Sequence, residues 1–474
     1  MRKYTQLGLV IICVLSIGGL LVMERRYSKM KVFLEVADIF QTSESRAKCN
    51  QQLEKLRATL EQAYLPETTH AVVGPSWRQI GAPPATTFAY SALYRAAEAK
   101  VVVLMVSSVK PESCRLRFRA HGGPSATNEN HHEIAATVSV LATLDGLSAM
   151  AVNCPMMMTT TTKASTNSSS SANATLSSPV AVDLLGVSLP VSDVTESPSA
   201  EGRVAICVRP LDTTVGEVQV AEFVTYYSHI GVADFLVYDE SLPGDLKTFV
   251  KRTPFIEPTV SAHQVDWNVP TSLNATLTEA IFKADCLLRS GATSRYVAML
   301  SLNEYLVLRR EPANVTAFLA TVLHNAGEVL AVHERLFCEE FADDVIASAL
   351  NYPFVTLRKT RFSRNDKQHR LVFAQAGSLA PLAKLLPGGL APESGRAYVS
   401  EGSAHLNVYT SCRRLHFWLR KNNLLQQQHQ QQQQQNAFQS SVDTYLTKLH
   451  ELFFSSRLYK HTLHQKSPTY YLIA

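Results

Sequence analysis

The segment from Val204 to Leu308 most constrains the fold, because short apolar runs alternate in it with amphipathic runs. The apolar runs have the length of buried strands, and they are Val204–Val208, Phe235–Tyr238 and Tyr296–Leu300. The runs between them predict two helices, each opened by a capping box: Thr214 with Glu217 and Thr276 with Glu279. This order of strands and helices predicts an α/β fold with a mostly parallel sheet flanked by helices.

Polar residues follow two of the predicted strands directly. Asp239 comes after the second strand, and residues 301–304, with the sequence SLNE, come after the third. Ligands of open α/β sheets bind beyond the carboxyl ends of the strands. The sequence therefore predicts a ligand site that includes Asp239 and residues 301–304.

The rest of the chain divides by composition. The run VVVLMV, inside Lys100–Ser107, predicts a buried strand in an N-terminal β-rich portion. The Ser/Thr tract Thr159–Ser178 is typical either of an O-glycosylated insert or of a plain loop. The predicted parts are the β-rich portion at 76–155, a Ser/Thr-rich insertion or linker at 156–203, the α/β domain at 204–425, a Gln-rich loop at 426–436 and a C-terminal helical segment at 437–474.

The N-terminus carries an uncharged apolar run of 17 residues, Leu7–Met23. This length is the short end for a membrane-spanning helix, and it is open to a second interpretation as a cleaved signal peptide. Because no good small-x-small cleavage site follows the run, we expect a transmembrane signal anchor at 7–23, a cytoplasmic tail at 1–6 and a stem at 24–75. Leucines three and four apart, from Leu53 to Leu60, predict a stem helix that either joins two chains or packs one stripe of a solvated helix.

Other features bear on the compartment and the partners. The chain has four N-x-S/T sequons, at Asn167, Asn173, Asn274 and Asn314. It has eight cysteines, and Cys13 lies in the apolar run, so seven remain. In an oxidising compartment seven cysteines leave one without a partner in the same chain, and the stem residue Cys49 could pair between chains. We expect Cys207 and Cys286 to form disulfides rather than to act as nucleophiles. A net charge of +5, from 45 basic and 40 scattered acidic residues, gives no reason to expect nucleic acid as a partner.

Several stretches of the sequence resemble one known family. They are CVRPL at 207–211, EFVTYYSHIGVADFLVYD at 222–239, ADCLLR at 284–289 and MLSLNEYLVL at 299–308, with Trp77 and YSALY at 90–94 upstream. Together they resemble glycosyltransferase family 92, over about 77–413 with the Ser/Thr tract as an interruption. The resemblance implies a GT-A fold in a single-pass type II membrane protein of the Golgi or another secretory-pathway membrane. It also implies transfer of a hexose, usually galactose, from a UDP-sugar to a glycan with the help of Mn²⁺.

The metal motif of the family is altered in this sequence. The family has Asp-x-Asp-Glu where this chain has Ser301, Leu302, Asn303 and Glu304. A divalent ion neutralises the leaving diphosphate and is held by hard, charged oxygen ligands. Asn303 and Glu304 are the metal ligands that the resemblance retains, and we expect their affinity for Mn²⁺ to be much reduced.

The remaining candidates follow from the same comparison of residues. The nucleotide-sugar site is predicted at Arg209, Asp239, Ser301 and Asn303, with strand-end turn capping as the alternative role of Asp239. Glu304 and His333 are the candidate catalytic residues. The alternative role of Glu304 is an ion pair with Arg309 or Arg310, and the alternative for His333 is a position in the core. Glu334, next to His333, is a further candidate base.

Three further groups of residues complete the candidates. Arg358, Lys359 and Arg361 form a basic cluster that could replace the ion. The late His-Tyr-Arg element of the family has Val408, Tyr409 and Thr410 as its nearest match, with His405 as a substitute. Asp285 is expected to be a helix-packing carboxylate.

Two functions from different classes remain open at this point. One is a glycosyltransferase, with UDP-sugar donor and glycan acceptor, whose site works without the ion or with a weakened one. The other is a catalytically inactive relative that binds glycans or acts as a lumenal scaffold. Loss of charge at Ser301 and Asn303 favours the second, and retention of Glu304 favours the first.

Overall fold

A computed structural model describes thirteen stretches of the chain: residues 76–80, 87–118, 130–156, 178–194, 202–211, 214–309, 314–326, 328–349, 352–363, 369–386, 396–412, 440–442 and 450–458. The predicted anchor, stem and Gln-rich loop lie outside these ranges, as do Cys49 and the sequons Asn167 and Asn173. Among the described residues, no helix combines the length and apolarity needed to cross a membrane.

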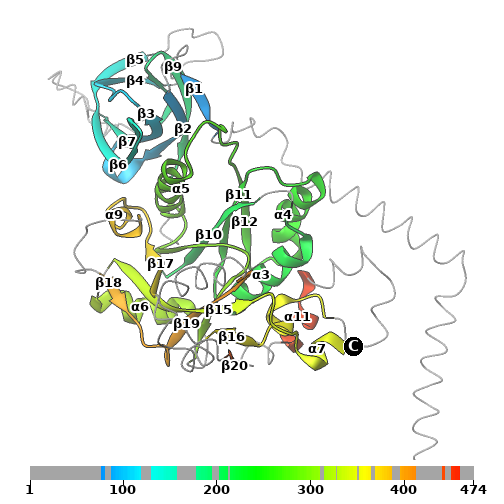
Figure 1. Cartoon of the computed structure of the whole chain (residues 1–474). Coiled ribbons are helices and arrows are strands. Elements are labelled where there is room, and N and C mark those ends of the chain that lie inside the picture. The colour runs from blue at the N-terminus through cyan, green and yellow to red at the C-terminus, as the bar shows by residue number, and fades with distance from the viewer. Residues whose placement is uncertain are drawn as a thin grey trace, which may run out of the picture. The chain divides into compact units, whose positions relative to one another are not determined.

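The N-terminal part of the described chain is a nine-stranded sheet with the order β5-β4-β8-β9-β2-β3-β7-β6, and β1 pairs with β2 (Figure 1). Its strands are β1 Arg78–Ile80, β2 Thr87–Arg95, β3 Lys100–Ser107, β4 Ser113–Phe118, β5 Asn130–Ala135, β6 Thr137–Leu144, β7 Leu147–Pro155, β8 Pro179–Leu184 and β9 Val187–Asp193, and the short helix η1 Ala96–Glu98 joins β2 to β3. The run VVVLMV lies in β3, where seven of eight residues are buried. A disulfide between Cys114 and Cys154 links β4 to β7.

The hairpin β8–β9 falls inside the range 156–203, for which the sequence predicts an insertion or linker. Both strands belong to the sheet, because β8 pairs with β4 and β9 pairs with β2. The sequence did not predict this hairpin, because a Ser/Thr-rich tract precedes Pro179 and the two strands are short and only partly apolar. The segment between β7 and β8 is therefore shorter than predicted.

A second nine-stranded sheet has the order β12-β11-β10-β13-β17-β15-β19-β14, with β18 paired to β15. Its strands are β10 Val204–Leu211, β11 Asp234–Asp239, β12 Ser261–Asp266, β13 Tyr296–Leu300, β14 Glu304–Leu308, β15 Val329–Cys338, β17 His369–Gln375, β18 Arg396–Tyr398 and β19 Ala404–Thr410, while β16 Arg361–Ser363 and β20 Ser440–Val442 form a separate pair. The α/β fold is thus confirmed.

The prediction of a mostly parallel sheet is wrong for the second half of this sheet. The four strands β12, β11, β10 and β13 are parallel, but β17 runs antiparallel to both β13 and β15, and β14 is antiparallel to β19. The regular strand–helix alternation that predicts parallel pairing ends at β13. Beyond it, pairing is set by contacts between segments far apart in the sequence, so the sheet is mixed.

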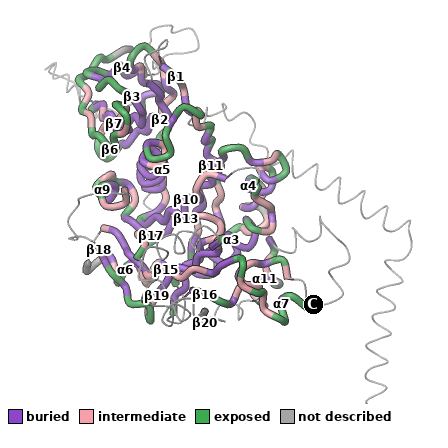
Figure 2. The backbone as a smooth tube through the Cα atoms, in the orientation of Figure 1, coloured by how far each residue is buried: buried purple, intermediate pink, exposed green. Residues whose placement is uncertain are grey.

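Helices cover the two faces of this sheet. They are α3 Glu217–His229, α4 Gly244–Ile256, α5 Ala275–Ser290, α6 Val315–Ala326, α7 Val345–Ala349, α8 Val355–Arg358, α9 Leu382–Leu385 and α11 His450–Ser455. The core on one face contains α3 side chains with Ile206 and Leu300, and the core on the other contains α5 side chains with Cys207 and Met299. Figure 2 shows α5 and β10 as buried along most of their length.

The helix starts differ from the predicted capping boxes. Helix α3 begins after Gly216, whose N–H donates to the side chain of Gln219, so Thr214 is not its cap. Helix α5 is capped by Asn274, whose side chain accepts from the N–H of Thr276. The cap of α3 thus lies two residues after the predicted threonine, whereas the cap of α5 lies two residues before it and Thr276 belongs to the first turn of the helix.

Helix α5 also joins the two sheets. Its residue Asp285 is completely buried and accepts hydrogen bonds from Ser91 of β2 at 2.8 Å and from Tyr238 of β11 at 2.7 Å. Arg289, one turn later on α5, donates two bonds of 2.9 Å to the same carboxylate. Beside it, five aromatic rings from both sheets and from α5 are in contact: Trp77, Tyr90, Tyr238, Trp267 and Phe282. The predicted packing role of Asp285 is therefore a role in joining two sheets.

Replacement of Asp285 tests this interpretation. We expect Asp285→Ala to lower the free energy of unfolding by about 3 kcal/mol or more, because it leaves the buried Arg289 without its counter-charge. Ser91→Ala, which removes one neutral donor, should cost about 1 kcal/mol. Urea denaturation of both variants checks this. Equal losses in the two variants would contradict a central role for the carboxylate.

Candidate active site

The strand order reverses direction between β10 and β13. The chain passes from β10 to β11 and β12 on one side, and then places β13 on the other side of β10. In open α/β sheets the ligand crevice lies at the carboxyl ends of the strands at such a switch point. Val208 of β10 is paired with Leu300 of β13, so the next residues, Arg209 and Ser301, both lie at this edge of the sheet. The structure therefore brings together two of the predicted site residues.

Glu304 is the one carboxylate that the altered motif retains, and both of its oxygens have partners. Its Oε2 accepts from the backbone N–H of Ser301 at 2.9 Å, and its Oε1 lies 2.6 Å from the Arg370 guanidinium of β17. The residue is only 4% exposed. Glu304 thus forms the ion pair foreseen as its alternative role, but with Arg370 instead of Arg309 or Arg310.

Asn303 fixes the same loop to strand β19. Its Nδ2 donates to the carbonyl of Tyr409 at 2.6 Å, and the Tyr409 N–H donates to the carbonyl of Asn303 at 2.9 Å. Tyr409 belongs to the late element that the family resemblance pointed to. The loop after β13 is therefore held by side-chain and main-chain hydrogen bonds, with no charge contributed by Ser301 or Asn303.

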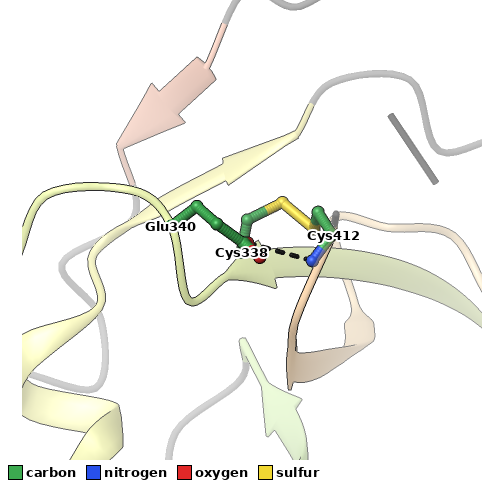
Figure 3. Close-up of side chains that lie close together, drawn as sticks. All are labelled: Cys338, Glu340 and Cys412. Carbon is green, nitrogen blue, oxygen red and sulfur yellow. Dashed lines mark hydrogen bonds between the residues drawn. A yellow bond between two sulfur atoms is a disulfide. The ribbon is translucent and has the colours of Figure 1, made fainter. Parts of the chain in front are cut away.

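The donor set of this loop does not fit Mn²⁺. A divalent ion prefers several carboxylate oxygens, and the loop offers only the carboxylate of Glu304, which is already engaged. Over the described ranges, the single group of three metal-type side chains is Cys338, Glu340 and Cys412 (Figure 3). The two cysteines form a disulfide, and Glu340 accepts from the Ser411 hydroxyl and from the Cys412 N–H. This group therefore has a structural role, because it links β15 to the residues that follow β19.

Asp239 occupies the end of β11 as predicted, with the role of a turn-capping carboxylate. It is 6% exposed; its Oδ1 accepts from the Leu242 N–H at 2.7 Å, and its Oδ2 accepts from Gln264 at 2.6 Å and pairs with Lys247 at 2.9 Å. Three partners fix this side chain at the start of α4. Asp239 therefore holds the turn between β11 and α4 in place, at the edge of the sheet where the candidate site lies.

Basic side chains gather at the carboxyl ends of β10 and β13. Arg209 pairs with Glu279 of α5 at 2.7 Å, and Glu279 also pairs with Lys283 at 3.2 Å. Arg209 and Lys283 line a cavity of about 30 Å³ between α5 and the sheet. Burial lowers the pKa of Lys283, and repulsion from Arg209 and Arg370 adds to this, while Glu279 opposes it. Arg209 and Arg370 therefore both act electrostatically on Lys283.

The structure places His333 on the face of the sheet opposite to Arg370. His333 is level with His369 and His405 of the neighbouring strands, whereas Arg370 is level with Val332. Because side chains alternate along a strand, Glu334 shares the face of Arg370 and Glu304. Burial raises the pKa of Glu334, and the charge of Glu304 adds to that rise while Arg370 opposes it. Glu334, not His333, thus faces the altered motif.

The predicted basic cluster at residues 358–361 has other contacts. Lys359 donates to the carbonyls of Glu339 and Phe341 and pairs with Asp343 at 2.7 Å, and Arg358 lies 3.8 Å from the same carboxylate. Arg370 was missed because it is a single arginine in the β17 sequence HRLVFAQ. Only the pairing of β17 with β13 and β15 brings it to Glu304.

Comparison with known proteins bears on the first part of the α/β domain. Residues 202–341 match the sequence model described as Glycosyltransferase family 92, which confirms the resemblance over these residues. A search of curated proteins finds no match.

Solved structures resemble the chain distantly. TarS 1–349 from S. aureus has a TM-score of 0.27 at 9% identity, covering 47% of this chain and 64% of that chain. HddC from Yersinia pseudotuberculosis has a TM-score of 0.25 at 9% identity, covering 44% of this chain and 90% of that chain. A putative glucose-1-phosphate thymidylyltransferase from Bacillus anthracis, in complex with a sucrose, has a TM-score of 0.25 at 8% identity, covering 48% of this chain and 96% of that chain. Such scores carry no argument about function.

Glu222, within the family-like stretch of α3, gives the domain a pH dependence. Its buried carboxylate accepts from the N–H groups of Val355 and Thr356 and from the Thr356 hydroxyl, at the start of α8. Burial raises its pKa from 4.5 to about 7, although these hydrogen bonds and Arg358 oppose the rise.

A carboxyl group whose pKa is raised on folding stabilises the protein less as the pH rises. The native state holds a proton between pH 4.5 and about 7 that the unfolded state has lost, so stability falls over this window and levels off above it. We expect a loss of about 3 kcal/mol from this group. Denaturation of the wild type and of Glu222→Gln at pH 5 and pH 8 measures it. An unchanged pH dependence in the variant would show that another group is responsible.

Proposed function

We propose that this chain is a secretory-pathway glycosyltransferase-like protein that binds a UDP-sugar at the carboxyl ends of β10 and β13 without a divalent ion. The observation that carries the proposal is the pairing of Glu304 with Arg370, which puts a guanidinium beside the one carboxylate that the altered metal motif retains. Arg209 and Lys283 add two further cations near the same edge. Guanidinium and ammonium groups can neutralise a diphosphate in place of a metal.

The reaction that we propose is transfer of a hexose, galactose by the precedent of the family, to a hydroxyl group of a glycan. Arg209 and Arg370 bind the diphosphate and stabilise the charge that develops when UDP leaves with the electron pair of its bond to the sugar. Glu334 accepts the proton of the acceptor hydroxyl as that oxygen bonds to the anomeric carbon. A raised pKa suits this task, because a base works best when its pKa lies near the working pH.

A second candidate function is a catalytically inactive relative that binds glycans or acts as a scaffold. It is favoured by the engagement of Asp239 and Glu304, whose oxygens are all paired inside the protein. Such a protein would keep the geometry of the loop at residues 301–304 but would not catalyse sugar transfer. Binding and transfer measurements on one preparation separate the two functions.

The location is part of the proposal. Disulfides persist in oxidising compartments, and the described residues contain three, Cys114–Cys154, Cys207–Cys286 and Cys338–Cys412. The sequon residues Asn274 and Asn314 are exposed caps of α5 and α6, where a glycan could be attached. Together with the apolar run 7–23 these features support a type II Golgi or secretory-pathway protein with a lumenal domain.

Binding of UDP-galactose by the full-length protein tests the site. We expect binding that is the same with Mn²⁺ and with a chelator, and about tenfold weaker in Arg209→Ala, because hydrogen bonds to charged groups contribute strongly. Isothermal titration measures both. Arg361→Ala, which removes an exposed arginine of β16, is the matched control and should bind normally.

Other outcomes would change the proposal in defined ways. Binding that requires Mn²⁺ would disprove an ion-independent site, and absence of binding under both conditions would leave the second candidate. Glu334→Gln should keep UDP-galactose binding and lose transfer of labelled galactose to glycans. If Ser301→Asp combined with Asn303→Asp fails to create Mn²⁺-dependent binding, the alignment of this loop with the family motif is wrong.

The anchor is tested by fractionation of expressing cells. We expect full-length protein in the membrane fraction, resistant to carbonate extraction, with residues 1–23 still attached. Peptide mapping of the N-terminus provides the readout. Soluble protein in the medium that begins after Met23 would show a cleaved signal peptide instead.

A further inference from the structure

Strand β14 lies at one end of the second sheet in the described part of the chain, with β19 on its inner side. The N–H and C=O groups of successive residues point to opposite sides of a strand, so the outer side of an edge strand carries groups that no strand pairs with. Glu304 is 4% exposed and Leu306 is completely buried. The burial of β14 therefore requires other hydrogen-bond partners on its outer side.

Two consecutive tyrosines of α3 supply these partners. The hydroxyl of Tyr227 donates to the carbonyl of Glu304 at 2.9 Å and accepts from the N–H of Leu306 at 2.9 Å. The hydroxyl of Tyr226 donates to the carbonyl of Leu306 at 2.5 Å. The two phenol groups thus take the place of a further strand along the first residues of β14.

Burial and ring contacts fix Tyr227 in this position. The residue is completely buried, and its ring centroid lies 4.6 Å from that of Phe223 in the same helix and 6.2 Å from that of Tyr305 in β14. Burial raises the pKa of Tyr227 well above its usual value, and the charge of Glu304 is one of those that add to the rise. The hydroxyl therefore keeps its proton and remains a donor to the Glu304 carbonyl.

Glu304 is held at both its main chain and its side chain. Its N–H donates to the carbonyl of Ser301, and its carbonyl accepts from Tyr227. Its carboxylate accepts from the Ser301 N–H and pairs with Arg370. Loss of the Tyr227 hydroxyl would leave two buried backbone groups of β14 without a partner, which costs free energy unless the strand shifts or admits water. Either change would move the Glu304 carboxylate relative to Arg370.

We propose that Tyr227 is a positioning residue of the candidate active site, because it fixes Glu304 and, through Glu304, the guanidinium of Arg370. Its effect on ligand binding rests on the function proposed above, in which Arg370 binds the diphosphate of a UDP-sugar. Tyr226 is next in the chain and almost as deeply buried, but it donates its one proton to Leu306, two residues beyond Glu304. Tyr226 is therefore the matched control for Tyr227.

Replacement of each tyrosine by phenylalanine in the full-length protein tests the proposal. Both changes keep the ring and remove one hydroxyl, so both should lower the melting temperature by a similar amount. Hydrogen exchange of the Ser301 N–H reports the position of the Glu304 carboxylate, which accepts from it. We expect Tyr227→Phe to speed this exchange about tenfold, and Tyr226→Phe to change it by less than about twofold.

Binding of UDP-galactose is the second readout. Isothermal titration should show binding about tenfold weaker in Tyr227→Phe, and changed by less than about twofold in Tyr226→Phe. When Arg370 is already replaced by alanine, Tyr227→Phe should weaken binding by less than about twofold more, because Tyr227 acts through the contact that is then absent. Equal weakening by Tyr227→Phe in the presence and absence of Arg370 would show a general structural role and overturn the proposal.

Two results of hydrogen exchange would also overturn it. They are unchanged exchange of the Ser301 N–H in Tyr227→Phe, and equal acceleration in the two variants. The wild type alone gives a third test, because the Leu306 N–H should be strongly protected, and exchange as fast as that of an exposed amide would show that Tyr227 does not hold β14. Exchange is measured without UDP-galactose, so absence of UDP-galactose binding by the wild type would contradict the active-site proposal and leave these results unaffected.

Discussion

The arrangement of the two sheets depends on the hydrogen bonds and the ion pair of the buried Asp285 carboxylate. Arg289 neutralises it, while Ser91 and Tyr238 attach it to the N-terminal sheet and to β11. With its charge balanced, α5 can pack between apolar surfaces on both sides, as its almost continuous burial requires. The same helix is bonded to β10 by the disulfide Cys207–Cys286, and its Glu279 holds Arg209. The position of the candidate active site therefore depends on α5.

The loop of the altered metal motif keeps its shape through contacts that need no ion. Glu304 accepts from the N–H of Ser301, and Asn303 and Tyr409 exchange two hydrogen bonds. Replacement of the two family aspartates by Ser301 and Asn303 thus removes charge without removing the scaffold. Arg370 supplies the charge opposite Glu304. The loop geometry is therefore separate from metal chemistry, which is what the ion-independent binding that we propose requires.

The opposite character of the two edges follows from the direction of the helices. In each strand–helix–strand unit the helix starts at the carboxyl edge of the parallel strands and ends at the amino edge. Helix dipoles therefore make the first edge favourable to anions and the second favourable to cations. The side chains of Arg209 and Lys283 add to the field of the first edge, while Glu257 and the basic residue His229 both lie at the second. The anionic diphosphate that we propose matches the field of the first edge.

The sequence by itself determined the strand–helix pattern from Val204 to Leu300 and the likeness of residues 202–341 to glycosyltransferase family 92, because local periodicity and residue identity carry this information. Only the tertiary structure decided that Arg370 meets Glu304, that Glu334 rather than His333 faces them, and that Cys207 pairs with Cys286. These contacts join strands and helices far apart in the chain. Their partners depend on strand order, pairing direction and the alternation of side chains, which a local pattern does not encode.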